Sequence, residues 1–590
     1  MSENPNVGLG TEEIVWNLQD LYQGVDDQLV RSDIEWCEKE ALAIRTAFAG
    51  KLAALGDAGL LELVTRLEKL ETMLGRLSTF AFLNFTTQTL SPEAGAFLQK
   101  MKEVQSRTAR ETVFFELEWN KVPDEIAGSL LSSEKLSHYH HYLATLRKYA
   151  SHLLSEPEEK LLLEKAPVGR SSWNNLFDKV MGNLKFGKEG RTEEEVLAEL
   201  YHPDRVVRKQ ASEDLTEGLG SNLHILTHIF NTLLAEKMID DRLRKYEGWV
   251  SSMNLYNDLE DETVRVLIDT VISRYDIPQR YYRLKRSLLD LPEIYDYDRY
   301  APLPHLPTER IDWQQCKTTV LSAFADFSPL MAEVADSFFQ KNWIHAPILK
   351  GKRGGAFAHP CVPEVHPYVM VNYTGNIRDV STVAHELGHG IHQHLAAEQG
   401  YYNSGTTLVL AETASVFAEL LLFQSQLALI GSREEQRAFT CQKLESIFAT
   451  VFRQVSMNRF EELVHCARRE EGELSSEAMS RHWLATQQAM FGDSLSLTEN
   501  YRIWWSYIPH FLNSPGYVYS YAFGELLVLA LYKIYQEEGG DFVPKYLEML
   551  SAGGSKSPYE LVKPFGVDLN DPEFWLGGLS IIENMLASVE

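Results

Sequence analysis

Residues 379–399 read DVSTVAHELGHGIHQHLAAEQ and carry the most informative pattern in the chain. Helical periodicity follows a polar start, so we expect a helix that begins near Asp379 or Ser381, either of which can cap its N-terminus. His385 and His389 are four residues apart, so both imidazoles project from one helix face, one turn apart. That spacing lets two nitrogens reach one Zn²⁺ at about 2.0–2.1 Å. The stretch therefore predicts a metal-binding helix.

Glu386 directly follows the first histidine. There it lies beside the metal, where it can take a proton from metal-bound water. Gly388 and Gly390 each cost a helix interior about 1 kcal/mol relative to Ala, so we expect another part of the backbone to approach closely there. The alternative, a helix that merely contains two histidines, explains neither the glycines nor the third ligand described next.

Glu412 lies 23 residues after His389 in the apolar run LAETASVFAEL. A lone carboxylate in an apolar helix needs a partner, and a metal ion is a suitable one. Glu419 lies two turns further on the same face, from where it can orient a ligand histidine. His392 shares the stripe of His385 but lies about 10 Å along the axis from it. We expect His392 either to support the ligands or the substrate, or to make a plain polar contact.

Strand-like sequence is concentrated in residues 351–373, GKRGGAFAHPCVPEVHPYVMVNY. Alternation in 368–373 predicts a short strand just before the metal helix. An exposed strand edge could pair with an extended peptide, and Gly354 and Gly355 would permit close approach. Phe357, Tyr368 and Val369 are the other substrate-binding candidates here. The alternative is a small structural hairpin.

Residues 501–527, YRIWWSYIPHFLNSPGYVYSYAFGELL, concentrate phenol and imidazole groups around a Ser-Pro-Gly turn. His510, Tyr517 and Tyr521 could donate hydrogen bonds to a tetrahedral oxyanion. Aromatic residues that anchor the start of a helix would give the same pattern. The residues alone leave both interpretations open.

Composition limits the class of protein. The 590 residues include 56 Lys+Arg and 83 Asp+Glu, a net charge of −27, which argues against nucleic-acid and anionic-membrane partners. The longest apolar runs fall short of the roughly 20 residues that span a bilayer. Five scattered cysteines without a C-x-x-C pair suit a reducing compartment. Helical periodicity dominates elsewhere, so we expect a mainly α-helical cytoplasmic protein.

A second histidine cluster, SHYHHYLATL, contains His138, His140 and His141. The stretch also carries two tyrosines and no acidic partner. We therefore expect solvated or packing roles for these histidines, without a metal.

The metal helix resembles the signature D-V-x-T-x-x-H-E-x-G-H-x-x-H of the thimet oligopeptidase and oligoendopeptidase F metallopeptidases. Residues 412–419, ETASVFAE, resemble the third-ligand helix of that family. Leu387 and the Glu-Thr-Ala-Ser run are closer to oligoendopeptidase F. The family also carries a His, then a Gly-Tyr and further tyrosines, which favours His510 and Tyr517, and then Tyr521, as oxyanion donors.

The resemblance implies a multi-helix, zincin-type protein shaped like a clam or box. A small sheet would lie beside the metal helix, and a deep internal channel would take the substrate. It further implies a helical domain over residues 1–190 that forms one wall of the cleft, and a catalytic domain over 191–590. One Zn²⁺ per chain would be held by His385, His389 and Glu412. Glu419, with His392 and Asp379, would support these ligands.

These observations predict a zinc-dependent endopeptidase that hydrolyses internal bonds of short, unfolded oligopeptides. A zinc-bound water would attack the peptide, with Glu386 as general base. The first alternative is a carboxypeptidase or dipeptidyl carboxypeptidase, which needs a cation for the free carboxylate of the substrate. Arg353, Arg453 and Arg502 are candidates for that cation. The second alternative is a zinc-stabilised, non-catalytic peptide-binding protein.

Overall fold

The structure is a computed structural model that describes residues 6–306 and 310–590. The chain forms two compact units that interleave along the sequence. Unit 1 contains residues 1–150, 307–429 and 534–567, and unit 2 contains residues 151–306, 430–533 and 568–590. The division of the chain at residue 190 stays a prediction.

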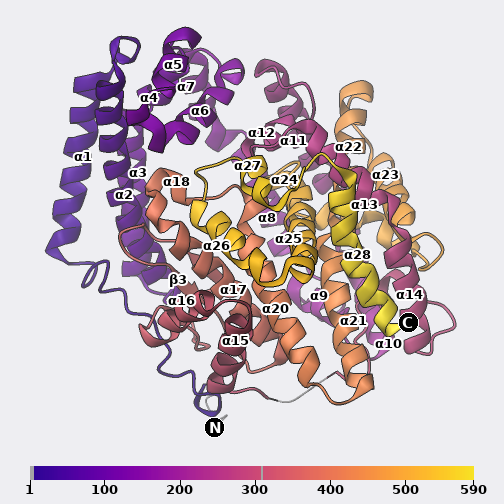
Figure 1. Cartoon of the computed structure of the whole chain (residues 1–590). Coiled ribbons are helices and arrows are strands. Elements are labelled where there is room, and N and C mark those ends of the chain that lie inside the picture. Colours follow the sequence, from indigo (N-terminus) through magenta and orange to yellow (C-terminus); the bar gives the residue numbers. More distant parts are fainter. Residues whose placement is uncertain (1–5, 307–309) are drawn as a thin grey trace. The chain divides into compact units, whose positions relative to one another are not determined.

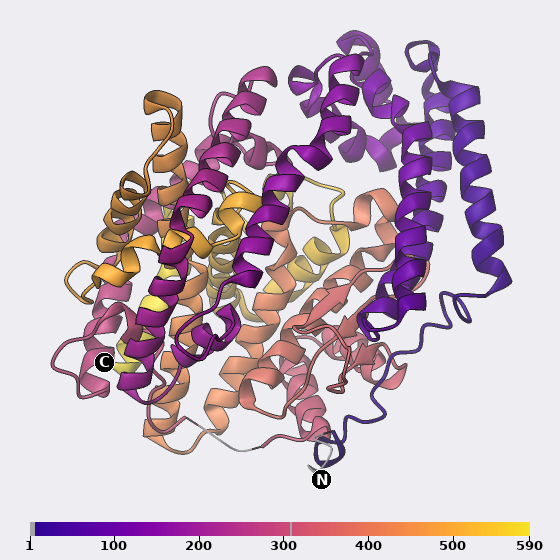
Figure 2. The same cartoon turned by 180° about the vertical axis from the view of Figure 1, so that it is seen from behind.

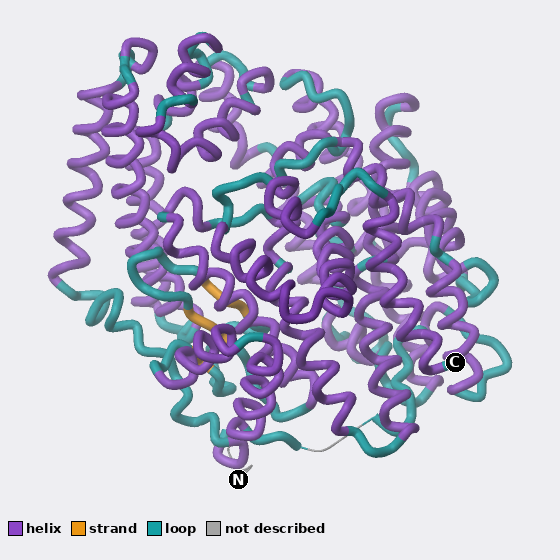
Figure 3. Tube along the Cα trace, viewed as in Figure 1, coloured by secondary structure: helices purple, strands orange, loops and turns teal. Residues whose placement is uncertain are grey.

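Helices make up most of the described chain, and its few strands are short (Figure 3). The prediction of a mainly α-helical protein with a small sheet beside the metal helix is confirmed. Each unit has its own buried apolar cluster. The predicted substrate channel stays a prediction.

Unit 1 begins with three long helices that lie side by side (Figures 1 and 2). These are α1 (Gln28–Phe48), α2 (Asp57–Thr86) and α3 (Pro92–Thr112). The leucine stripe of α2, with Leu60, Leu63 and Leu67, is buried in the apolar cluster of this unit. Its spacing of three and four residues puts these leucines on one helix face. Short helices follow: α4 (Phe114–Trp119), α5 (Asp124–Leu131), η3 (Glu134–Tyr139) and α6 (His140–Lys148).

The second segment of unit 1 carries the sheet and the metal helix. Helices α15 (Trp313–Phe327) and α16 (Pro329–Gln340) precede strands β1 (Ile344–His345), β2 (Phe357–His359) and β3 (Tyr368–Met370). The strand order is β1-β3-β2, with β1 parallel and β2 antiparallel to β3. Helices α17 (Ile377–Ala396), α18 (Tyr401–Ser404), α19 (Leu408–Ala411) and α20 (Thr413–Leu429) follow, and α26 (Phe542–Ala552) and α27 (Pro558–Val562) complete the unit.

Every regular element described in unit 2 is a helix, and turns and loops join these helices. Its first segment contains α7 (Glu156–Lys165), α8 (Arg170–Asn183), α9 (Glu193–Glu199), α10 (Arg205–Ser221), α11 (Leu223–Leu243), α12 (Ser251–Tyr256), α13 (Asp261–Ser273) and α14 (Asp276–Leu288). Later segments add α21 (Arg433–Thr450), α22 (Phe452–Glu471), α23 (Ser476–Phe491), η8 (Glu499–Tyr507), α24 (His510–Asn513) and α28 (Pro572–Val589). Helix α25 (Tyr519–Glu538) starts in unit 2 and ends in unit 1.

The stretch Leu408–Leu429 is long and apolar enough to cross a membrane by length and composition alone, with a mean hydropathy of 1.4. The sequence analysis expected no such stretch, because it considered unbroken apolar runs and this one is interrupted by Glu412 and Glu419. In the structure 67% of its apolar window is buried. The stretch therefore has the apolar composition and the burial of a core helix.

Candidate active site

The metal helix α17 starts earlier than the sequence predicts. Asn376 is its N-cap, and the Asn376 side chain accepts a hydrogen bond from the Asp379 backbone N–H. In return, the Asp379 carboxylate accepts a 3.4 Å hydrogen bond from Asn376 N, and it also accepts from Thr374 N (2.7 Å) and Thr374 Oγ1 (2.5 Å). These reciprocal bonds satisfy backbone N–H groups at the helix start. Every described hydrogen bond of the Asp379 carboxylate stays in this turn, so Asp379 acts as a helix cap in the structure.

His385, His389 and Glu412 come together in unit 1. The Nε2 atoms of His385 and His389 lie 3.1 Å apart. Glu412 Oε2 lies 3.4 Å from His385 Nε2 and 3.5 Å from His389 Nε2. Among the described residues, this is the one group of three or more His, Cys, Asp or Glu side chains close enough to hold a metal ion.

These three atoms fit a metal ion. Zinc bonds of about 2.0–2.2 Å in a tetrahedral arrangement place neighbouring ligand atoms roughly 3.2–3.6 Å apart. The three measured separations, 3.1, 3.4 and 3.5 Å, match that requirement closely. Two imidazoles and one carboxylate are also a ligand set of catalytic zinc sites, in which a fourth position stays open.

Two further side chains form hydrogen bonds with members of this group of three. Glu419 Oε1 lies 2.6 Å from His385 Nδ1, so this bond orients the ring and leaves Nε2 for the group of three. Burial alone would lower the pKa of His385, but Glu419 and the nearby carboxylates raise it to about 9. Ser415, which is buried, donates a hydrogen bond of 2.7 Å to Glu412 Oε2. The sequence analysis missed Ser415, although its position three residues after Glu412 on a helix was a usable signal.

Gly388 packs closely against another part of the backbone, as predicted, whereas Gly390 packs against a side chain. A Cβ atom at Gly388 would lie 2.6 Å from both Ala414 O and Ser415 Cα. A Cβ at Gly390 would lie 2.6 Å from the ring of Phe338. Gly388 therefore lets α17 approach the backbone of α20, and this contact brings Glu412 to the two histidines.

Glu386 is only 7% exposed. Burial is the largest influence on its pKa and raises it to about 7; Glu412 also raises it, while His385 and a backbone hydrogen bond with Ala358 lower it. A carboxylate with a pKa near neutrality is well suited to take and return a proton. His392, further along the helix, is also buried, and burial lowers its pKa to about 4, so it is neutral near pH 7.

The sheet has one strand edge next to the metal helix. Strand β2 is an outer strand, and Ala358 in β2 forms the backbone hydrogen bond with Glu386. Gly354 and Gly355 are exposed in the turn before β2. The side chains of Tyr368 and Val369 are fully buried in β3, which is paired on both sides. An added peptide strand would therefore meet β2 at Phe357–His359 rather than β3.

Unit 2 gathers the second set of predicted residues. His510 Nε2 lies 3.3 Å from the hydroxyl of Tyr521. The ring of Tyr517 stacks parallel to that of His510, with centroids 6.2 Å apart, and meets Tyr521 edge-on at 4.9 Å. All three side chains are half-buried. They form a compact cluster of imidazole and phenol groups.

The turn before Tyr517 rests on a residue that the sequence analysis did not single out. Glu461 on α22 is fully buried, and its Oε1 accepts a 2.9 Å hydrogen bond from Gly516 N. Gly516 has a φ of +79° and lies close to Val250, so another residue would be strained there. A buried carboxylate on an otherwise amphipathic helix was the available signal.

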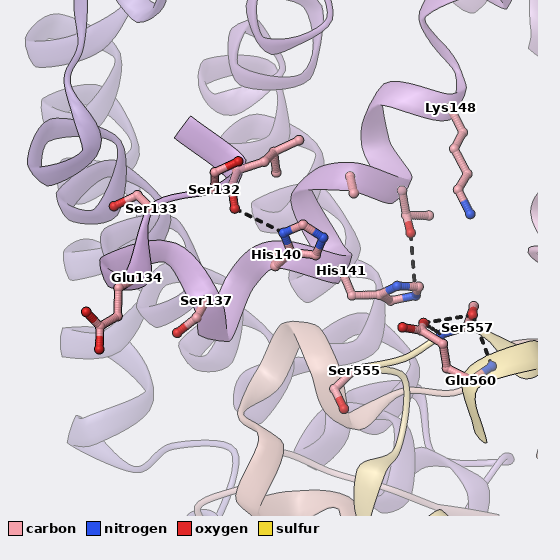
Figure 4. A pocket seen from close by; sticks show the side chains of 13 residues that line it. Ser132, Ser133, Glu134, Ser137, His140, His141, Lys148, Ser555, Ser557 and Glu560 are labelled. Carbon is pink, nitrogen blue, oxygen red and sulfur yellow. Dashed lines mark hydrogen bonds between the residues drawn. The ribbon is translucent and has the colours of Figure 1, made fainter. Parts of the chain in front are cut away.

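Two members of the second histidine cluster, His140 and His141, line a cavity of about 490 Å³ in unit 1 (Figure 4). His140 Nδ1 lies 3.1 Å from Leu131 O, and His141 Nε2 lies 3.5 Å from the Thr145 hydroxyl. Leu131 lies at the end of α5, and Thr145 lies on the same helix as His141. Among the described residues, no group of three or more candidate metal ligands lies here.

Family models and known proteins match this chain over most of its length. The model of peptidase family M3 matches residues 198–581, and that of oligopeptidase F matches residues 118–186. Oligopeptidase PepF of Bacillus subtilis is 27% identical over 588 residues, which cover 98% of this chain and 87% of PepF. An oligoendopeptidase F homolog of Lactococcus lactis subsp. lactis is 24% identical and covers 98% of this chain and 97% of its own.

Solved structures share the fold. A crystal structure from Chlamydophila abortus has a TM-score of 0.85 at 23% identity and covers 100% of this chain and 98% of its own. Oligoendopeptidase-F from Enterococcus faecium has a TM-score of 0.70 at 21% identity, and the match covers 95% of this chain and 96% of its own.

A helical chain that carries such a histidine–glutamate group and such relatives is a metallopeptidase. Since the M3 family model spans residues 198–581, the chain belongs to peptidase family M3. The resemblance to oligoendopeptidase F is thereby confirmed.

Proposed function

We propose that the chain is a zinc endopeptidase that cuts internal bonds of short, unfolded oligopeptides. One observation carries the proposal. His385, His389 and Glu412 present three ligand atoms 3.1–3.5 Å apart, and the buried carboxylate of Glu386 lies on the same helix as the two histidines. Family membership supports peptidase activity.

His385, His389 and Glu412 would hold one Zn²⁺ per chain. The ion supplies Lewis acidity to a water molecule and to the carbonyl of the scissile bond. Hydrogen bonds within the chain orient two of these side chains. The 2.6 Å bond from Glu419 fixes the orientation of His385, and Ser415 fixes Glu412.

Glu386 would act as the general base and then as the general acid. Its carboxylate takes a proton from the attacking water and delivers it to the nitrogen of the leaving amine. The pKa near 7, a result of burial, allows both transfers near neutral pH. His510, Tyr517 and Tyr521 are the proposed hydrogen-bond donors to the oxyanion.

Substrate selection would depend on backbone recognition. The outer strand β2, with Phe357–His359, offers an edge that an extended peptide can join, and Gly354 and Gly355 leave open space beside it. A folded protein cannot present such an extended segment. We place the enzyme in the cytoplasm, because all five cysteines are free and a reducing compartment suits them.

Glu386→Gln tests the mechanism, with Glu398→Gln as the matched control. Glu398 lies at the end of the same helical region, but its side chain is exposed. We expect both variants to bind one zinc per chain. Only the Glu386 variant should lose cleavage of a quenched fluorescent peptide of about ten residues, and its rate should fall by a factor of about 10²–10⁴. Retention of most activity would contradict the proposal.

Product masses separate the endopeptidase from its alternatives. An endopeptidase yields two internal fragments, whereas a carboxypeptidase or dipeptidyl carboxypeptidase releases one or two residues from the C-terminus. Peptide that binds to the zinc-loaded protein and stays intact would favour the binding protein.

A further inference from the structure

The loop that leads into β2, residues 351–355, is held in place from two sides. The backbone N–H of Arg353 donates a 2.8 Å hydrogen bond to Thr86 O at the end of α2. The Asn372 side chain, shortly after β3, donates to Arg353 O (3.0 Å) and to Gly355 O (2.8 Å). The backbone position of Arg353 is therefore fixed by contacts with two other segments of unit 1.

Lys352, the residue before Arg353, uses its charged group inside the protein. Its Nζ donates to three backbone carbonyl oxygens, those of His345 (3.2 Å), Pro347 (2.8 Å) and Val371 (2.7 Å). An ammonium group has three donors, so all of them are engaged at the ends of β1 and β3. Lys352 thus ties the loop to the sheet and has no donor left for a ligand.

Arg353 presents its charged group to the outside. Its side chain is exposed, and its Cζ lies 5.8 Å from the centroid of the Phe82 ring on α2. Among the residues that the structure describes, no Asp or Glu forms an ion pair with Arg353, although the chain contains 83 acidic residues. An arginine held by its backbone and placed over an aromatic ring is suited to bind a carboxylate from another molecule.

Phe82 connects Arg353 with the outer strand β2. Its ring lies 5.4 Å from the ring of Phe357 and 5.4 Å from that of His359. These two residues share a face because alternate residues of a strand point the same way. A peptide strand joined to β2 would place every second side chain on this face, about 4.5–5.5 Å from the neighbouring Cβ atom of β2. Such a side chain would lie beside Phe82 and Arg353.

We propose that Arg353 is a specificity-determining residue that binds the side-chain carboxylate of an Asp or Glu in the peptide substrate, at one fixed position from the scissile bond. The proposal rests on the proposed peptidase function, which supplies the peptide. Strand β2 contacts the metal helix α17, and both belong to unit 1. An arginine binds a carboxylate through two parallel N–H groups. Lys350 is also exposed in this segment, so the local charge favours an acidic residue.

The test uses ten-residue quenched fluorescent peptides that are acetylated and amidated, so that neither chain end carries a charge. A single Glu or Lys replaces Gln at each position in turn, and mass spectrometry maps the cut. We expect Glu at one position to raise kcat/KM about 3- to 10-fold over Lys, and high salt to reduce this ratio. Arg353→Gln should remove the preference without slowing the Gln peptide, and Arg353→Glu should reverse it.

Arg110→Gln is the matched control, since Arg110 in the last turn of α3 is exposed and likewise has no described ion pair; it should keep the preference. Equal kcat/KM for the Glu and Lys peptides at every position would overturn the site. A preference that survives Arg353→Gln, or an equal loss with all peptides in that variant, would also overturn it.

The two proposals can fail separately. Cleavage without a preference that depends on Arg353 refutes the site alone. If no peptide is cleaved, the peptidase function is refuted, and calorimetry of the same peptides with the zinc-loaded protein decides the site. Tighter binding of the Glu peptide, lost in Arg353→Gln, would support it, and equal binding of the Glu and Lys peptides would refute it.

Discussion

Gly388→Ala tests whether the contact between α17 and α20 builds the metal site. The new Cβ would lie 2.6 Å from Ala414 O and from Ser415 Cα. Both are backbone atoms, and ordinary carbon contacts are about 3.5–4.0 Å. The two helices must therefore separate by roughly 1 Å, whereas metal–ligand distances tolerate about 0.2 Å. Since Glu412 directly precedes α20, it would leave the histidines.

The expected result is a loss of zinc affinity of about 10- to 100-fold, with a parallel loss of peptide cleavage at limiting zinc. The stability change should be smaller, because overpacking of about 1–3 kcal/mol is offset by about 1 kcal/mol of helix propensity. Zinc affinity is measured by competition with a chromophoric chelator.

Gly390→Ala is the control for this experiment. Its Cβ would meet the tip of the Phe338 ring, which lies on α16, so the helix contact that carries Glu412 is unaffected. We expect near-normal zinc affinity from this variant. A Gly388→Ala protein that binds zinc as tightly as the wild type would refute the reasoning.

Three other changes have distinct signatures. Glu419→Gln weakens the bond that orients His385, and zinc affinity, measured by the same competition, should fall about tenfold or more. Tyr517→Phe removes one proposed oxyanion donor, so kcat should fall by about 10²–10³ with little change in KM. Burial raises the pKa of Glu461 to about 8, above its unfolded value of roughly 4.3, so the contribution of Glu461 to stability is fully present below that value and is lost as the pH rises through about 8. The free energy of unfolding, measured in urea, should not show this decline with pH in Glu461→Gln. Parallel pH profiles for the wild type and the variant would contradict this prediction.

The metal helix could be predicted because its signal is local. The spacing of His385 and His389 on a 3.6-residue period fixes their relative placement. Gly388 indicates that another segment of the chain packs closely against this helix. Glu412 followed from its unusual position in an apolar run. Each of these inferences needs only the geometry of one helix.

Other features depend on contacts between distant segments. The position of β3 as the middle strand, which buries Tyr368, follows from pairing with β1 and β2 and not from its alternation. Asp379 caps the helix because the Thr374 turn folds back onto it. Sequence periodicity carries no information on such tertiary pairings.

X-ray absorption at the zinc edge of the purified, active enzyme tests the central claim most directly. Our account predicts one zinc per chain, bound by two imidazole nitrogens at about 2.0–2.1 Å and by carboxylate oxygen, without sulfur. His389→Ala should lose this spectrum together with peptide cleavage. Active enzyme that contains no zinc, or zinc bound by sulfur or without imidazole, would contradict the account.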